Sequence, residues 1–110
     1  MARKLDESIT LDFTTSNPLS GILQDADVPP TSGVFEDDTD VPILTPVVTK
    51  RAALTGDYRL TFLASAANGF EVDKSYNVIV EATVAGVTAK ARIASFNLDP
   101  TSSGAGGFNL

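Results

Sequence analysis

The feature that most limits how this chain can fold is a two-residue alternation over residues 75–98. Apolar side chains occupy every second position in the first half of this segment, at Tyr76, Val78, Val80, Ala82 and Val84. Alternation with period two is typical of a β-strand that buries one face. Because the Ala85-Gly86 pair separates two such runs, the segment is predicted to form a β-hairpin.

Centring the loop on Ala85-Gly86 fixes the expected pairing of the two strands. The expected partners are Val84 with Val87, Ala82 with Ala89, Val80 with Ala91, and Val78 with Ile93. This register sets Glu81 opposite Lys90, an attractive pair of charges. A slip by one residue would place charged side chains beside the valines, so the register is favoured. Alanine is poorly suited to a two-residue primed turn, and a wider loop in the same register is an alternative.

Further strands are predicted by the same alternation. They are expected around Ile9–Phe13, at Gly33–Glu36 and over Tyr58–Ala64, with a loop from Ser16 to Ser32. The Val41–Thr49 segment is apolar, but its two prolines cannot donate to a sheet. It is therefore expected at a sheet edge or as two short pieces. Ser65–Gly69 is a connector with room for one helical turn.

About seven short strands without an amphipathic helix favour an all-β fold. We expect an immunoglobulin-like or fibronectin-like β-sandwich over residues 8–99, with extended arms at residues 1–7 and 100–110. A small open β-barrel is the alternative. Tyr76 follows a turn at the start of a late strand, as in the tyrosine corner of such sandwiches. It is otherwise an ordinary core tyrosine, and its expected role is structural in both cases.

Composition excludes several kinds of chemistry. The chain has 110 residues, enough for one domain, and its net charge of −6 disfavours nucleic acid as a partner. Without cysteine or histidine there are no disulfides, thiolate nucleophiles, Ser-His-Asp triads or His-ligated metals. No enzymatic activity and no cofactor are expected. The segment after Met1-Ala-Arg-Lys lacks the apolar core of a signal peptide, and no run is long enough to span a membrane.

A cluster of acidic residues is the best candidate for a ligand site. Asp37, Asp38 and Asp40 lie close together, with Asp25 and Asp27 upstream. Carboxylates grouped on a loop suit calcium, although the run lacks the glycine and the later glutamate of an EF-hand. The favoured alternative is a solvated turn, with no metal bound.

Two surfaces are candidates for docking a partner. At the termini, Arg3 and Lys4 are basic, and Phe108 and Leu110 follow a glycine-rich stretch. Apolar residues on such an arm would serve as anchors in a neighbour's groove, or would pack back on their own domain. The second surface is the hairpin face that carries Lys90 and Arg92, where Ile79, Ala94 and Phe96 are also expected. A second layer would cover it, or a partner would dock there.

Motifs at turns and strand starts carry a family resemblance. They are Ala26-Asp27, Pro30-Thr31, Val34-Phe35-Glu36-Asp37-Asp38-Thr39-Asp40, Pro42-Ile43, Thr55-Gly56, Tyr58-Arg59, Asn68-Gly69-Phe70-Glu71, Lys74-Ser75-Tyr76 and Val78. Over residues 5–99 the chain resembles small immunoglobulin-like virion structural proteins of tailed bacteriophages and prophages, of the capsid decoration type. One departure is Asp73, where the family often has glycine.

The resemblance implies a role in the virion and brings no catalytic residues. It implies a protein made in the bacterial host cytoplasm whose partners are the major capsid protein, other virion proteins or further copies of itself, with no nucleic acid or membrane. The expected function is capsid decoration. The alternatives are a neck or tail adaptor or accessory protein, and a module that binds a cell-surface glycan through the acidic loops and a metal.

Overall fold

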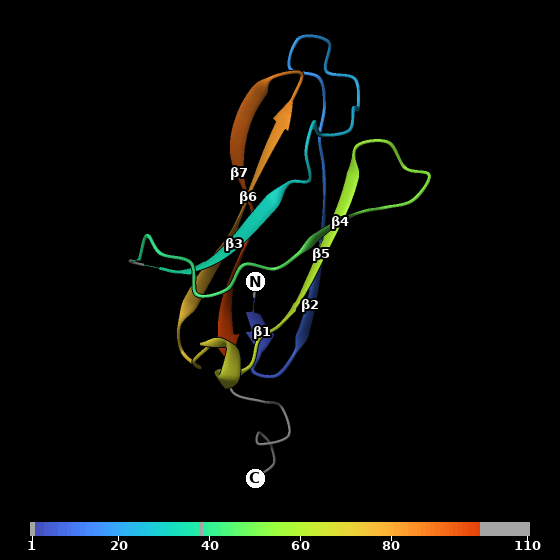
Figure 1. Ribbon diagram of the computed structural model, residues 1–110. Helices are drawn as coiled ribbons and strands as arrows, with labels where there is room; N and C mark the ends of the chain where they lie inside the picture. The colour runs from blue at the N-terminus through green and yellow to red at the C-terminus, as the bar shows by residue number, and fades with distance from the viewer. Residues whose placement is uncertain (1, 38, 100–110) are drawn as a thin grey trace.

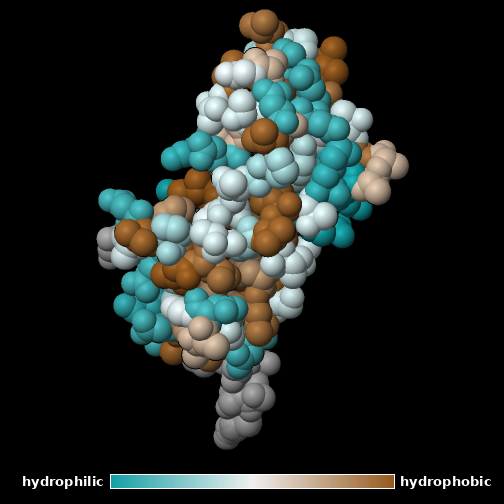
Figure 2. Space-filling view, in the orientation of Figure 1, coloured by the Kyte–Doolittle hydropathy of each residue, from teal (hydrophilic) through white to brown (hydrophobic). Residues whose placement is uncertain are grey.

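The computed structural model describes residues 2–37 and 39–99, which form an elongated domain of two β-sheets (Figures 1 and 2). Its strands are β1 (Ala2–Lys4), β2 (Ser8–Thr14), β3 (Thr31–Glu36), β4 (Val48–Lys50), β5 (Asp57–Leu63), β6 (Ser75–Val84) and β7 (Val87–Asp99). One 3₁₀ turn, η1 (Ala66–Asn68), occupies the connector where a helical turn was expected. No described helix has the length and apolar character needed to cross a membrane.

The strand order is that of an immunoglobulin-like sandwich. One sheet has the order β1-β7-β6-β3 and the other β2-β5-β4. The sets β3-β6-β7 and β2-β5-β4 correspond to the C-F-G and B-E-D strands of immunoglobulin domains. The expected all-β sandwich is therefore confirmed.

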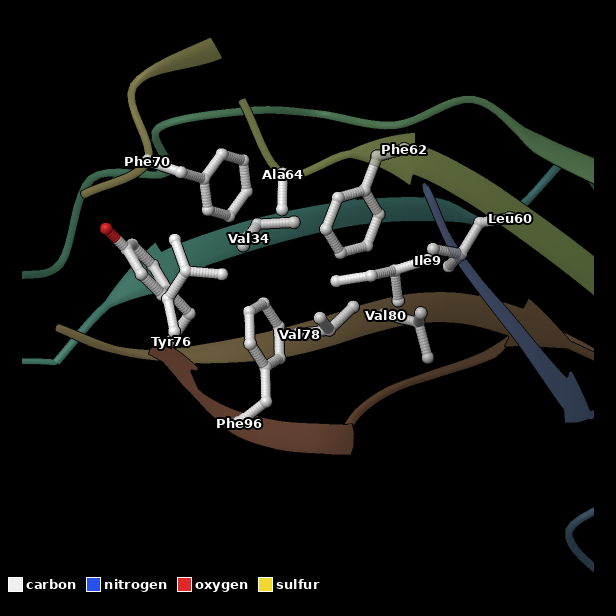
Figure 3. Close-up of a cluster of buried hydrophobic side chains, with 11 residues drawn as sticks. Ile9, Val34, Leu60, Phe62, Ala64, Phe70, Tyr76, Val78, Val80 and Phe96 are labelled. Atoms are coloured by element: carbon white, nitrogen blue, oxygen red, sulfur yellow. The ribbon is translucent and has the colours of Figure 1, made fainter. Parts of the chain in front are cut away.

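Side chains from both sheets meet in one hydrophobic core (Figure 3). Its buried members are Ile9, Val34, Leu60, Phe62, Ala64, Phe70, Tyr76, Val78, Val80, Phe96 and Leu98. At one end the Phe70 and Tyr76 rings lie 4.8 Å apart between centroids. The turn of the β6–β7 hairpin lies at the opposite end of the sandwich from the end of β7 (Figure 1).

The hairpin has the expected register only as far as Arg92. Val84 pairs with Val87, Glu81 with Lys90 and Val80 with Ala91, as predicted. Val78, however, pairs with Ala94 rather than with Ile93, which is the extra residue of a β-bulge. The expected Val78–Ile93 pair is therefore wrong.

The bulge reverses which side of β7 faces the core. Because one residue is inserted, the side chains beyond Ile93 exchange faces, and Phe96 and Leu98 become buried. Phe96 was expected on the hairpin face that carries Lys90 and Arg92. It instead packs against Tyr76, with 5.6 Å between ring centroids.

The Val41–Thr49 segment forms two short pieces, one of the two expected arrangements. Ile43 and Leu44 exchange backbone hydrogen bonds with Val34, and Val48–Lys50 then pairs with β5. The segment thus passes from one sheet to the other.

Residues 2–7 lie against the sandwich instead of extending from it as an arm. β1 runs parallel to β7, with Ala2 beside Asn97 and Lys4 beside Asp99. The Glu7 carboxylate accepts hydrogen bonds from the Lys4 backbone N–H at 2.9 Å and from the Arg3 guanidinium at 2.8 Å. These bonds anchor β1 to the chain that follows it.

Candidate docking surface

The end of the molecule that carries the hairpin turn has an open apolar groove. Its volume is about 210 Å³, and its apolar lining includes Phe13, Pro18, Val80, Ala82, Val87 and Ala89. The residues come from the β6–β7 hairpin on one side and from the end of β2 and the chain after it on the other. We call this groove and the neighbouring loop of residues 16–24 the hairpin end.

The groove is open because the hairpin is longer than the strands that should cover it. β3 pairs with β6 only as far as Glu81, and β2 ends at Thr14. Val87, Ala89 and Ala91 therefore face inward like the core residues of β6 but remain exposed, with Val87 at 51%. Ala89 and Ala91 have small side chains, which leave space in the groove that a larger side chain would fill.

The 16–24 loop presents two large aliphatic side chains to solvent. Leu19 is 97% exposed and Ile22 69% exposed, and hydrophobic residues are seen at this end of the molecule in Figure 2. Single exposed hydrophobic residues are common on protein surfaces, but contiguous apolar patches mark interaction sites. Here the exposed aliphatic residues lie next to an apolar groove.

Hydrogen bonds within the loop hold this backbone in place. The Asn17 side-chain oxygen accepts from the N–H groups of Leu19 at 2.8 Å and Ser20 at 3.1 Å. The Asn17 amide donates to Gln24 at 3.0 Å, and Ser16 and Leu23 form a β-bridge. A rigid loop loses less conformational entropy on binding than a flexible one.

Asp27, which follows the 16–24 loop, forms hydrogen bonds with the turn of the β6–β7 hairpin. Its carboxylate accepts from the N–H groups of Ala85 at 3.1 Å and Gly86 at 2.9 Å, and its own N–H donates to the Thr83 carbonyl. Ala85 has φ +51° and Gly86 φ +78°, the signs of a type I′ turn. The two-residue loop therefore forms despite the alanine, and the wider alternative does not.

The acidic residues predicted as a calcium site are engaged separately. The Asp37 carboxylate accepts from the Asn77 amide at 2.7 Å, Asp25 accepts from Gly56 N–H at 2.6 Å, and Asp40 is exposed. Asp38 lies outside the described residues. Among the residues that the structure describes, no three acidic side chains gather as metal ligands would.

The outer face of the β6–β7 sheet carries a polar hollow of about 420 Å³. Its side chains bond to one another across the strands, since Ser95 donates to Asn77 at 2.8 Å and Ser75 donates to Asn97 at 2.6 Å. Arg92 lines this hollow, and Lys90 borders a second one beside Ile79 and Phe35. With Phe96 in the core, this face is more polar than expected.

Of the four residues proposed as docking anchors, two lie in the described structure. Arg3 and Lys4 belong to β1, where Arg3 pairs with Glu7 and the Lys4 ammonium lies 3.9 Å from the Asp99 carboxylate. Phe108 and Leu110 lie outside the described residues. The structure therefore places the two basic residues in the edge strand β1, each beside an acidic side chain.

Tyr76 has the hydrogen bonds of a tyrosine corner. Its ring is fully buried, and its hydroxyl accepts from the Glu71 N–H at 2.8 Å. Burial raises the pKa of this phenol. The turn that precedes it includes Asp73 at φ +66°, a left-handed backbone conformation that glycine adopts without strain.

Sequence patterns did not indicate the hairpin end as a docking surface. Leu19 and Ile22 lie between turn residues in a segment predicted only as a loop, and their spacing has no strand or helix period. The available signal was two large aliphatic residues among turn-forming ones. Nothing in the sequence indicated that Asp27 would bind a hairpin turn 58 residues later in the chain.

No protein-family model matches the chain, and neither a curated protein nor a solved structure matches it.

Proposed function

We propose that this chain is a non-enzymatic structural protein of a bacteriophage virion, a capsid decoration protein that binds the outer capsid shell. The observation that carries the proposal is the rigid apolar hairpin end, where Leu19 and Ile22 are exposed beside an open groove. An exposed hydrophobic patch is costly for an isolated protein and is typical of a surface that a partner covers. The sequence resemblance supplies the virion setting.

The shape of the molecule fits attachment by one end. The hairpin end and the end of β7 lie at opposite ends of an elongated sandwich (Figure 1). A module held through the hairpin end would project outward from its support. The polar outer face around Ser95 and Asn77 would then remain in contact with water.

The proposal is tested by binding the full chain to capsids of the phage that encodes it, after the native copies have been stripped. Replacing both Leu19 and Ile22 with serine should weaken capsid binding at least tenfold. Two exposed aliphatic side chains contribute about 1.4 kcal/mol or more when a partner covers them. Thermal unfolding should be unchanged, because both side chains are already exposed.

Val41→Ser is the matched control. Val41 is 73% exposed and lies in the 37–47 loop, away from the hairpin end (Figure 1). This variant should bind like the unaltered chain. If the Leu19/Ile22 double variant bound capsids as well as the unaltered chain does, the hairpin end would not be the docking surface. If the unaltered chain did not bind capsids, the capsid would not be its partner.

Counting the copies of the chain per particle distinguishes the two virion locations. A decoration protein of the shell would be present in hundreds of copies, and a protein of a neck or tail ring in about six or twelve.

A further inference from the structure

We propose that β7 accepts the 100–110 segment of a second copy as an added strand, with Phe108 and Leu110 seated in the groove of the hairpin end. The inference rests on the proposed function in one respect, namely that many copies gather on one particle. It assigns the groove of the hairpin end to a second copy and leaves the exposed Leu19 and Ile22 of the same end to the capsid.

The acceptor is a free strand edge. On the side away from β6, β1 pairs with β7 only from Asn97 to Asp99. Over the described part of the chain, no strand pairs with that side of β7 between Val87 and Ser95. Unpaired backbone donors and acceptors on such an edge bind an extended segment by β-augmentation.

The inward face of this edge leaves room for large side chains. Val87, Ala89 and Ala91 are exposed above the groove, which Phe13 and Val80 line from within. In an added strand, side chains two residues apart lie on the same face. Phe108 and Leu110 have this spacing, so both would enter the groove together.

Charge favours this segment over a second β7 strand. Lys90 and Arg92 lie on the outward face of the edge. If two β7 strands paired antiparallel about Ala91, Lys90 of each would face Arg92 of the other, and like charges directly opposite are destabilising. Residues 100–110 contain no charged side chain, so they meet no such repulsion.

The segment cannot seat both anchors in the groove of its own chain. After the shortest two-residue turn at residues 100–101, residues 102–104 would pair with Asp99, Leu98 and Asn97, where β1 already lies. Phe108 would then lie opposite Ile93, short of the groove, and only Leu110 would reach its border at Ala91. A neighbouring copy has no such obstacle. The resulting contact is head-to-tail and builds a ring or an open chain of copies.

Disulfide trapping tests the contact on the isolated full-length protein, because the chain has no natural cysteine. One variant carries Asn109→Cys and another carries Lys90→Cys, which places a thiol on the outward face of the edge. When the two are mixed under mild oxidation, the mixed dimer should exceed both homodimers several-fold. Adding Phe108→Ser to the Asn109→Cys chain should abolish that excess. Val41→Cys replaces Lys90→Cys as the control partner and should show no preference.

Two results would overturn the inference. One is a mixed dimer no more abundant than with the Val41→Cys control. The other is a chain carrying both cysteines that closes on itself in dilute solution, which would place the segment in its own groove. If the protein bound capsids but formed no disulfide-trapped mixed dimer, only this inference would be rejected and the proposed function would stand. If the mixed dimer formed but the protein did not bind capsids, the inference would stand and the proposed function would be rejected.

Discussion

Single side chains hold the turns of this domain by accepting hydrogen bonds from backbone N–H groups. Asp27 does so at the hairpin turn, Asp25 at Gly56 and Tyr76 at Glu71. Gly56 shows how tightly one of these turns is built. A Cβ atom there would lie 2.6 Å from the Thr15 carbonyl oxygen, and its φ of +69° strains any other residue. Asp25 and Asp27 hold the loops beside the hairpin end, whereas Tyr76 holds a turn at the start of β6.

Tyr76 gives a prediction at this scale. Tyr76→Phe removes the acceptor of the part-buried Glu71 N–H, so the free energy of unfolding should fall by about 0.5–1.5 kcal/mol. The pH dependence has a definite sign. Because burial raises the pKa of the folded-state phenol above its ordinary value of about 10, the unfolded chain loses this proton first. The contribution of the protonated Tyr76 phenol to the free energy of unfolding is therefore fully present below pH 10 and is lost as the pH rises above about 10.

Denaturant unfolding of both proteins between pH 8 and 11 measures this effect. The stability difference between the unaltered chain and Tyr76→Phe should narrow above pH 10. A difference that stays constant across this range would contradict the assignment of the alkaline loss to Tyr76.

At the scale of elements, the β-bulge at Ile93 decides which residues of β7 build the core. On its hairpin side, Val87, Ala89 and Ala91 face the groove, and on its other side Phe96 and Leu98 face the core. If Ile93 were paired regularly, the two halves of β7 could not both turn their apolar side chains inward, and leaving it unpaired changes the phase between them. The bulge thus links the core to the docking groove.

Deleting Ile93 tests this link. The deletion should restore continuous pairing and keep Ala94 opposite Val78 and Phe96 opposite Tyr76, so both halves of β7 should still face inward. The domain should therefore fold, with a loss of about 1–3 kcal/mol for the missing Ile93 side chain. Ile93→Val keeps the chain length and is the control, with an expected loss of about 1 kcal/mol. Circular dichroism during thermal unfolding measures both. A deletion variant that fails to fold would show that one extra residue at Ile93 is not what aligns the two halves of β7.

The sequence was sufficient to predict elements whose alternation is unbroken. β2, β5 and the hairpin up to Arg92 follow from period two, and the prolines at 42 and 46 indicated the divided segment before β5. The bulge was missed because its signal is a change of phase, from Ala89 and Ala91 to Phe96 and Leu98, which a single continuous strand cannot satisfy. β1 was missed because three residues are too few for a periodic pattern, and its position depends on Glu7.

The molecule as a whole is a β-sandwich whose two ends differ, and the proposed function assigns docking to the hairpin end. The core at the opposite end is closed by aromatic side chains, whereas the hairpin end keeps an open groove and exposed Leu19 and Ile22. The docking surfaces predicted from the sequence were the termini and the hairpin face that carries Lys90 and Arg92. The apolar groove and loop depend on strand lengths and on Asp27, which bring together residues that are far apart in the chain.

Hydrogen exchange on purified particles tests the central claim most directly. Exchange is compared by mass spectrometry between the free chain and the chain on the virion, using peptides that cover both ends of the sandwich. We predict slower exchange on the particle for residues 16–24 and 84–95, and unchanged exchange around the η1 turn and the start of β6. Protection confined to the η1 end, with residues 16–24 exchanging as in the free protein, would contradict the account.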